Sequence, residues 1–262
     1  MTDAAAGEGT PRPLEGKVAL VTGASRRIGR AIAIALGKQG AGIVAHDRII
    51  QEAETVRLCD ELTGCGGKSW KVIADLERPE DYESLIGRAV QAAGALDILI
   101  NNASIFQPNT LTDVSFGDVM RHVHVNAWAP FVLSREFARL AGRGKIINIL
   151  DTKISGVDPD HVAYILSKRM LATLTRMCAQ EFAPAITVNG VAPGLILPPA
   201  GRDESYLQQL AQTLPLKRHG GPGDVIDAVL FLLRSDFITG QVVFVDGGRH
   251  LQEDGHGPDT DQ

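Results

Sequence analysis

The sequence lacks the features that mark several large classes of protein. In its 262 residues no apolar run approaches the roughly 18 residues that a membrane-spanning helix needs. Residues 1–13 are small and polar and contain no apolar segment typical of a secretory signal. Lysine and arginine are scattered and the formal net charge is -5, which argues against a nucleic-acid partner. We therefore expect a cytoplasmic protein that binds neither membranes nor nucleic acid.

Cysteine and metal-binding patterns are scarce as well. The three cysteines cannot all pair, and none belongs to a C-x-x-C motif, so we expect free thiols in a reducing compartment. The seven histidines show no H-E-x-x-H or similar spacing. We therefore expect no metal site, and we expect His124, His161 and His219 to be surface or structural residues.

What the chain does have is a regular alternation of short apolar runs and longer segments of helical periodicity. The apolar runs are typical of buried strands and cover residues 17–22, 43–46, 69–74, 96–100, 145–150, 186–191 and 242–245. The helical segments lie near residues 31–36, 52–62, 81–92, 116–140, 161–182 and 222–233. Such alternation calls for parallel strands joined by right-handed crossovers. It predicts an α/β fold, a doubly wound (Rossmann) three-layer sandwich with a mostly parallel seven-stranded sheet.

The chain shows no internal repeat and no linker that would divide it. We therefore expect a single domain over residues 14–251, with enough apolar residues (44%) for a substantial core. Residues 1–13 and 252–262 are polar and rich in glycine, proline or aspartate. We expect both to be disordered tails.

The first predicted strand leads into a loop, T-G-A-S-R-R-I-G at residues 22–29, and then into a helix. Free N–H groups at a helix start attract anions, and small residues let a pyrophosphate approach the backbone closely. A glycine pair alone also fits an ordinary tight turn. Its place between the first strand and an amphipathic helix favours a dinucleotide-binding domain.

This spacing resembles the glycine motif T-G-x-x-x-G-x-G of the short-chain dehydrogenase/reductase family, and the resemblance covers residues 16–248. Arg27 stands where the family has its middle glycine, and Arg26 matches a basic position of NADP-preferring members. After the second strand, Asp47 matches an acidic residue that repels a 2′-phosphate, whereas Arg48 matches a phosphate-binding position. Three arginines against one aspartate favour NADPH, with NADH as the alternative.

Further motifs of the family follow in the expected order. They are Asp75-Leu76 beside adenine, Asn101-Asn102-Ala103 after the fourth strand, and Pro193-Gly194 beside the nicotinamide. The resemblance implies that the cofactor contacts Gly23, Ser25, Arg26, Arg27, Ile28, Gly29, Asp47, Arg48, Asp75, Leu76, Asn102, Ala103, Ser104, Tyr164, Lys168, Pro193, Gly194 and Ile196.

Tyr164 and Lys168 lie four residues apart on a predicted helix, so their side chains project from one face. A free phenol has a pKa of about 10, too high for efficient proton transfer at neutral pH. We expect the Lys168 ammonium to lower the Tyr164 pKa and to hold the cofactor's ribose. By the resemblance, Asn126 completes the catalytic set by ordering a water that leads to Lys168.

The remaining catalytic position departs from the family. Asp151 stands where the family has a serine that donates a hydrogen bond to a substrate carbonyl. An ionised carboxylate cannot donate, but it suits a substrate with N–H groups or a ring nitrogen that gains a proton. Together with Arg27 and the Ser104-Ile105-Phe106 segment, Asp151 resembles the pteridine reductase branch of the family. The resemblance implies that the substrate contacts Ser104, Phe106, Asp151, Tyr164 and Leu195.

These residues favour hydride transfer from NADPH to the C=N bond of a dihydropterin-like ring stacked on Phe106, with Tyr164 supplying the proton. Two alternatives stay open: a reductase of ketones or 3-oxoacyl thioesters, and an NADPH-binding regulatory protein. The segment 195–214 carries a short polar helix pattern in a region where family members diverge, so it does not reveal specificity. The resemblance also implies a homotetramer, or a dimer, assembled through the helices 116–140 and 161–182.

Overall fold

The computed structural model describes residues 12–199 and 201–252. Its centre is one sheet of seven parallel strands in the order β3-β2-β1-β4-β5-β6-β7, which confirms the predicted doubly wound α/β fold. The strands are β1 (Val18–Thr22), β2 (Gly42–Asp47), β3 (Ser69–Ile73), β4 (Ile98–Asn101), β5 (Gly144–Ile149), β6 (Ile186–Pro193) and β7 (Val242–Val245).

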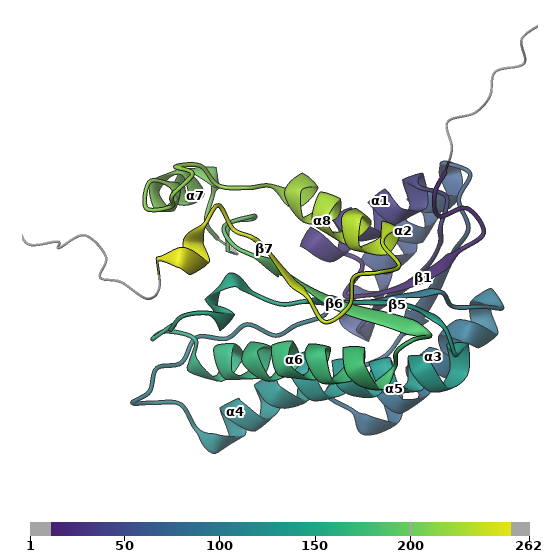
Figure 1. Cartoon of the computed structure of the whole chain (residues 1–262), viewed down its shortest axis with the longest axis horizontal. Coiled ribbons are helices and arrows are strands. Elements are labelled where there is room, and N and C mark those ends of the chain that lie inside the picture. The colour runs from purple at the N-terminus through teal and green to yellow at the C-terminus, as the bar shows by residue number, and fades with distance from the viewer. Residues whose placement is uncertain (1–11, 200, 253–262) are drawn as a thin grey trace, which may run out of the picture.

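Helices cover both faces of the sheet and make the outer two layers (Figure 1). One layer holds α1 (Arg27–Lys38), α2 (Glu52–Gly64) and α8 (Pro222–Arg234). The other holds α3 (Pro79–Ala93), α5 (Ala129–Ala141) and α6 (Val162–Glu181), with α4 (Phe116–Val123) packed beside α6. The short helix α7 (Glu204–Ala211) follows β6 and stands apart from both layers in Figure 1.

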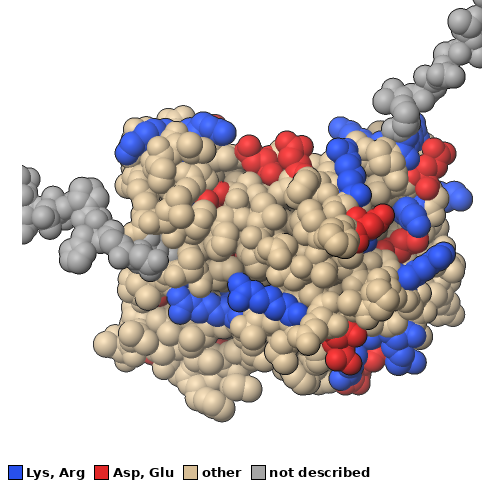
Figure 2. All heavy atoms as spheres, in the orientation of Figure 1, with Lys and Arg blue, Asp and Glu red and all other residues tan. Residues whose placement is uncertain are grey.

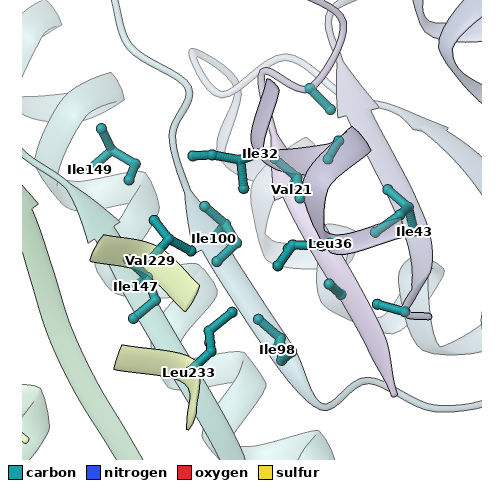
Figure 3. Close-up of a cluster of buried hydrophobic side chains, with 14 of the residues drawn as sticks. Val21, Ile32, Leu36, Ile43, Ile98, Ile100, Ile147, Ile149, Val229 and Leu233 are labelled. Atoms are coloured by element: carbon teal, nitrogen blue, oxygen red, sulfur yellow. The ribbon is translucent and has the colours of Figure 1, made fainter. Parts of the chain in front are cut away.

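The strands alternate between two hydrophobic cores, because successive side chains of a strand point to opposite faces. Figure 3 shows the core beneath α1 and α8, to which β1 contributes Val21 and β4 contributes Ile98 and Ile100. The neighbouring Leu20 and Leu99 enter the core on the other face. Burial on both faces explains why these strands read as continuous apolar runs in the sequence.

The helical pattern predicted over residues 116–140 is confirmed, since the chain is helical from the start of α4 to the end of α5, with one change of helix type. A π-helical turn, His124–Trp128, separates α4 from α5. Pro130 has no amide hydrogen to donate to the carbonyl of Asn126 four residues earlier, so the α-helical pattern is interrupted there. The wider turn buries the Asn126 side chain completely.

The carboxyl ends of the parallel strands meet at one edge of the sheet. The strand order reverses between β1 and β4, the point at which open α/β sheets form a ligand-binding crevice. The loops that follow β1, β4, β5 and β6 gather there, and they carry most of the predicted site residues.

On the face shown in Figure 2, basic and acidic side chains are interspersed, and a short row of basic residues lies over α6. Within residues 12–199 and 201–252 no helix is long and apolar enough to cross a membrane. The two predicted tails lie outside the described residues, apart from Arg12, Pro13 and Gln252.

Candidate active site

The loop after β1 can be built only with glycine at two positions. Gly23 adopts a left-handed conformation with φ of 63°. A Cβ on Gly29 would stand 2.1 Å from the Gly23 carbonyl oxygen and 2.5 Å from Asn102 Nδ2. The start of α1 therefore lies directly against the loop.

Asn102 fastens this loop to the loop after β4. Its Nδ2 donates to the carbonyl oxygens of Thr22 at 2.9 Å and Gly23 at 3.1 Å. In return, Thr22 Oγ1 accepts from the backbone N–H of Asn102 at 2.9 Å and of Ala103 at 3.0 Å. Thr22 is thus a structural partner of the cofactor loop to which the sequence analysis gave no role.

Arg27 replaces a glycine and adopts a glycine-like conformation, with φ of 53°. A left-handed backbone costs a non-glycine residue about 1–2 kcal/mol. Its Nη1 and Nη2 both donate to the Pro198 carbonyl oxygen at 3.0 Å. The guanidinium therefore points toward the loop after β6, which follows the Pro193-Gly194 pair that the resemblance puts beside the nicotinamide.

The carboxylate of Asp47 turns inward. Its Oδ2 accepts from Ser25 Oγ at 2.5 Å and from Ser25 N at 3.3 Å, while Oδ1 accepts from Arg48 N at 2.9 Å. Arg26 and Arg48 are exposed, and neither guanidinium makes a hydrogen bond or ion pair with a described residue. The helix α1 begins without a side-chain cap or an acidic residue in its first turn. Free N–H groups and two guanidiniums fit a phosphate-bearing dinucleotide.

The residues predicted to contact adenine lie where β3 ends. Asp75 closes a turn in which its Oδ1 accepts from Glu77 N at 3.0 Å. Leu76 is buried in the core on the α3 side of the sheet. The Asp75 side chain is therefore partly engaged in local structure, and its contact with adenine stays a prediction.

Tyr164 and Lys168 lie one turn apart on α6 and are both buried, with exposed fractions of 7% and 3%. The Tyr164 hydroxyl donates to Asp151 Oδ2 at 3.0 Å. Lys168 Nζ donates to the Ile149 carbonyl oxygen at 2.8 Å and lies 5.7 Å from the centre of the Tyr164 ring. The structure thus brings three of the four predicted catalytic residues together.

The protonation of this group differs from the sequence expectation. Burial raises the pKa of Tyr164 well above its ordinary value, and the neighbouring Asp151 charge raises it further. Burial also raises the pKa of Asp151 and lowers the pKa of Lys168 to about 8. The expectation that Lys168 lowers the Tyr164 pKa is wrong for this arrangement, because the carboxylate is the closer charge. The phenol is held protonated, which is the state of a proton donor.

Asn126, the fourth predicted member, acts here as a bracket for the loop after β4. Its Oδ1 accepts from Ile105 N at 2.8 Å and from Ser104 Oγ at 3.1 Å. Its Nδ2 donates to the Ile105 carbonyl oxygen at 2.9 Å and to Ser167 Oγ on α6 at 3.0 Å. Both the oxygen and the nitrogen of the Asn126 side-chain amide therefore already have two hydrogen-bond partners each. We expect any water between Asn126 and Lys168 to bind the main-chain carbonyl of Asn126.

Phe106 stands at the mouth of the site. Its ring lies 4.7 Å from the Tyr164 ring, centre to centre, in an edge-on arrangement at 84°. A second ring, that of His161, stacks on it at 4.1 Å and 13°. Phe106 remains 53% exposed. An exposed aromatic ring beside a proton donor is a surface on which a flat substrate ring can pack.

The turn after β6 completes the site. A Cβ on Gly194 would stand 2.7 Å from Asp246 Cβ, so this turn packs closely on the segment that follows β7. Ile196 is buried, and the Leu195 carbonyl oxygen accepts from Gly220 N at 3.0 Å. Pro193 is the last residue of β6 and pairs with Val245 of β7.

Sequence reasoning missed three residues around Phe106. His161, expected to be structural or at the surface, contacts Phe106, and Asp158 holds His161. Asn109 Oδ1 caps α6 by accepting from Ala163 N at 2.9 Å. These contacts join loops that are far apart in the sequence, so no local sequence pattern predicts them. The one local signal is the pair Pro108-Asn109, which is typical of turns.

Comparison of the sequence with known proteins identifies the family of this chain. A family model described as enoyl-(acyl carrier protein) reductase matches residues 23–250. Oxidoreductase UcpA of Escherichia coli K12 is 33% identical over 261 residues, covering 92% of this chain and 97% of UcpA. An NADPH-dependent aldehyde reductase-like protein of Arabidopsis thaliana is 34% identical over 258 residues, covering 91% and 96% of the two chains.

Among solved structures, FolM alternative dihydrofolate reductase 1 from Brucella canis, complexed with NADP, superposes with a TM-score of 0.88. The two sequences are 31% identical, and the match covers 95% of this chain and 99% of that one. The fold agrees with that structure over nearly the whole described chain. The chain belongs to the short-chain dehydrogenase/reductase family of NAD(P)-dependent oxidoreductases.

Proposed function

We propose that the protein is an NADPH-dependent reductase of a C=N bond in a pterin-like heterocycle, of the dihydropterin or dihydrofolate type. The observation that carries this proposal is the 3.0 Å hydrogen bond from Tyr164 to Asp151. A serine at this position could donate to a carbonyl oxygen, whereas a carboxylate repels the negative charge that forms there. The same carboxylate attracts the N–H groups of a nitrogen heterocycle.

The proton chemistry follows from the pair. NADPH, when bound, supplies a hydride to the carbon of the C=N bond and becomes NADP⁺. Tyr164 gives its phenolic proton to the nitrogen, so the bond becomes CH–NH. Burial and the Asp151 charge disfavour the resulting phenolate, so it takes a proton back from solvent. Asp151 accepts N–H hydrogen bonds of the ring and lies next to the phenol, so it offers a route for that proton.

The preference for NADPH over NADH rests on the residues after β1 and β2. Asp47 is the predicted site residue that would repel a 2′-phosphate. Its carboxylate already accepts hydrogen bonds from Ser25 Oγ and Arg48 N, and the residue is only 9% exposed. The exposed Arg26 and Arg48 guanidiniums supply charge-assisted hydrogen bonds to a phosphate. The structural neighbour from Brucella canis was solved with NADP.

The substrate class is supported by Phe106 and by the same neighbour, which is an alternative dihydrofolate reductase by name. The test is NADPH oxidation with a panel of dihydrobiopterin, dihydrofolate, a quinonoid compound and a 3-oxoacyl thioester. We expect the highest kcat/KM on a dihydropterin. Turnover confined to the thioester would overturn the proposal, and turnover on any of them would eliminate a purely regulatory role.

A second candidate is the reduction of ordinary aldehydes or ketones. The observation in its favour is the 34% identity with the aldehyde reductase-like protein of Arabidopsis thaliana. Here Asp151 would be neutral in the working enzyme, because a protonated carboxyl can donate to a carbonyl oxygen. This candidate predicts a higher kcat/KM on an aldehyde than on a dihydropterin.

We also propose that the protein assembles as a homotetramer through α4 and α6. Both helices present large apolar side chains to solvent: Phe116 and Met120 on α4 are 80% and 47% exposed, and Leu166 and Met177 on α6 are 46% and 60% exposed. Exposed apolar residues on adjacent helices are typical of subunit interfaces. Sedimentation equilibrium of the full chain tests this; a concentration-independent monomer would contradict it.

A further inference from the structure

The ring of Phe106 contacts two other rings, those of Tyr164 and His161. His161 covers one face of Phe106 at 4.1 Å and 13°, while Tyr164 meets the same ring edge-on at 84°. An isolated ring on a loop could turn about its own bonds. Two aromatic contacts at different interplanar angles favour one orientation of Phe106 relative to the Tyr164 ring.

His161 is itself held by a buried carboxylate. Asp158 Oδ2 lies 3.1 Å from His161 Nδ1 and 2.6 Å from Lys153 Nζ. Its Oδ1 accepts from Asp160 N at 3.0 Å, and Asp158 is only 7% exposed. Because an ionised carboxylate only accepts hydrogen bonds, His161 Nδ1 carries the hydrogen and the plane of its ring is set by Asp158.

Backbone pairing connects the two segments that bear Phe106 and His161. Asn109 N donates to the Asp160 carbonyl oxygen at 2.9 Å, and Val162 N donates to the Asn109 carbonyl oxygen at 3.2 Å. The Asn109 side chain adds the cap on α6 described above. These hydrogen bonds fasten the loop after β4 to the start of α6, the helix that carries Tyr164.

We propose that His161, oriented by Asp158, is a specificity-determining positioning residue that fixes Phe106 as a platform for planar-ring substrates. The inference rests on the proposed function, since it names how that site selects a ring. His161 covers one face of Phe106 and leaves the ring 53% exposed. His161 therefore contributes to the binding of a ring and leaves proton transfer from Tyr164 unchanged. Aliphatic substrates, which gain nothing from a flat surface, are indifferent to it.

The chain offers a matched control elsewhere. His250 stacks on Phe244 at 4.2 Å and 22°, and its Nδ1 lies 2.9 Å from Asp246 Oδ2. The same three residue types are thus arranged in the same way after β7. Phe244, however, is partly buried and packs against a core cluster. Loss of this second stack removes an equal aromatic contact without touching Phe106.

The test compares His161→Ala, His161→Phe, Asp158→Asn and His250→Ala with the unaltered protein. KM and kcat are measured with NADPH on dihydrobiopterin, an aryl aldehyde and an aliphatic aldehyde. Calorimetry gives the Kd of dihydrobiopterin on the enzyme loaded with NADP⁺. An aromatic pair contributes about 0.5–1.5 kcal/mol. We therefore expect His161→Ala to raise KM and Kd for the ring compounds about two- to tenfold. Its kcat should stay within about twofold, and the aliphatic KM should not change.

The remaining variants separate the stacked ring from its orientation by Asp158. His161→Phe keeps a stacked ring, so its KM for the ring compounds should equal that of the unaltered protein. The KM of Asp158→Asn for the same compounds should lie between those of the unaltered protein and His161→Ala. His250→Ala should leave the ratio of ring to aliphatic kcat/KM unchanged. A lower KM of His161→Ala for the ring compounds would mean that His161 competes with the substrate ring for Phe106. An equal loss of kcat/KM on ring and aliphatic substrates would mean that His161 is merely structural. Either result overturns the inference. Failure on dihydrobiopterin alone would sink the proposed function, while the aryl aldehyde and the calorimetric Kd would still decide this inference.

Discussion

At one end of the crevice, beyond β1 and β2, Arg26 and Arg48 are exposed and make no hydrogen bond or ion pair with a described residue. At the other end, Tyr164 and Lys168 are almost entirely buried, and Tyr164 is bonded to Asp151. We name the first the phosphate end (residues 23–29, 47 and 48) and the second the reducing end (Asp151, Tyr164 and Lys168). A phosphate carries its own full charge and can be met by solvated guanidiniums and free N–H groups. Proton transfer instead needs shifted pKa values, which burial produces.

The largest effect should come from the reducing end. Replacing Tyr164 by phenylalanine removes the proton donor and leaves the ring that packs against Phe106. General acid catalysis typically contributes about 10²–10⁴-fold, so kcat should fall by about that factor. The Kd of NADPH, measured by fluorescence titration, should change less than about twofold. An unchanged kcat would show that another group supplies the proton.

Next, Gly29→Ala should damage the phosphate end through packing alone. The new Cβ would stand 2.1 Å from the Gly23 carbonyl oxygen, so the loop must shift. Overpacking of this kind costs about 1–3 kcal/mol, which should appear as a lower melting temperature and weaker NADPH binding. The control is Gly87→Ala on α3, where a Cβ meets nothing within 4 Å; this variant should be neutral or slightly stabilising.

Under the proposed function, charge at the phosphate end sets the coenzyme preference. Arg26→Ala combined with Arg48→Ala should raise the KM for NADPH by about tenfold per guanidinium, because each hydrogen bond to a charged group contributes about 1.5–3 kcal/mol. The KM for NADH should hardly change. Arg30→Ala is the control. Arg30 lies on α1 and is exposed like Arg26 and Arg48, but its guanidinium is paired with Glu61. A parallel rise in both KM values would assign the two arginines to the loop structure.

The smallest effect is a shift of the pH profile at the reducing end. Burial lowers the Lys168 pKa from its ordinary value of 10.5 to about 8, so its ammonium is lost as the pH rises past about 8. We expect kcat/KM to decline above that pH. The Asp151 charge raises the Lys168 pKa, so Asp151→Asn should move the decline to lower pH. A decline that stays in place would exclude Lys168 as its source.

The same shift has a consequence for stability. Between about pH 8 and 10.5 the unfolded chain keeps the Lys168 proton while the folded protein has lost it. The free energy of unfolding should therefore rise with pH through this window as far as Lys168 is concerned. Lys168→Met should remove this contribution, as chemical denaturation at several pH values would show.

Much of the fold and part of the site follow from local sequence. The strands were predictable because burial on both faces leaves continuous apolar runs, as in β1. Tyr164 and Lys168 were predictable as a pair because helical spacing alone places them on one face. The interruption at Asn126 carried a signal in Pro130, which the helical periodicity of the surrounding residues concealed.

The rest depends on contacts between distant segments. Whether Asp47 faces a cofactor or Ser25 is decided by packing across 22 residues. The His161–Phe106 stack joins the loop after β4 to the start of α6, and the orientation of Arg27 depends on a carbonyl 171 residues away. The pKa of Tyr164 was misjudged because the sequence gives the charges but not their distances or burial.

The central claim is that the carboxylate beside the phenol commits the reducing end to a nitrogen heterocycle. The most direct measurement compares Asp151→Ser with the unaltered enzyme, as the ratio of kcat/KM on dihydrobiopterin to kcat/KM on a 3-oxoacyl thioester. A hydroxyl that donates to a carbonyl should reverse the preference, so the ratio should fall by at least about tenfold, with thioester activity kept or raised. A ratio that stays the same would contradict the account.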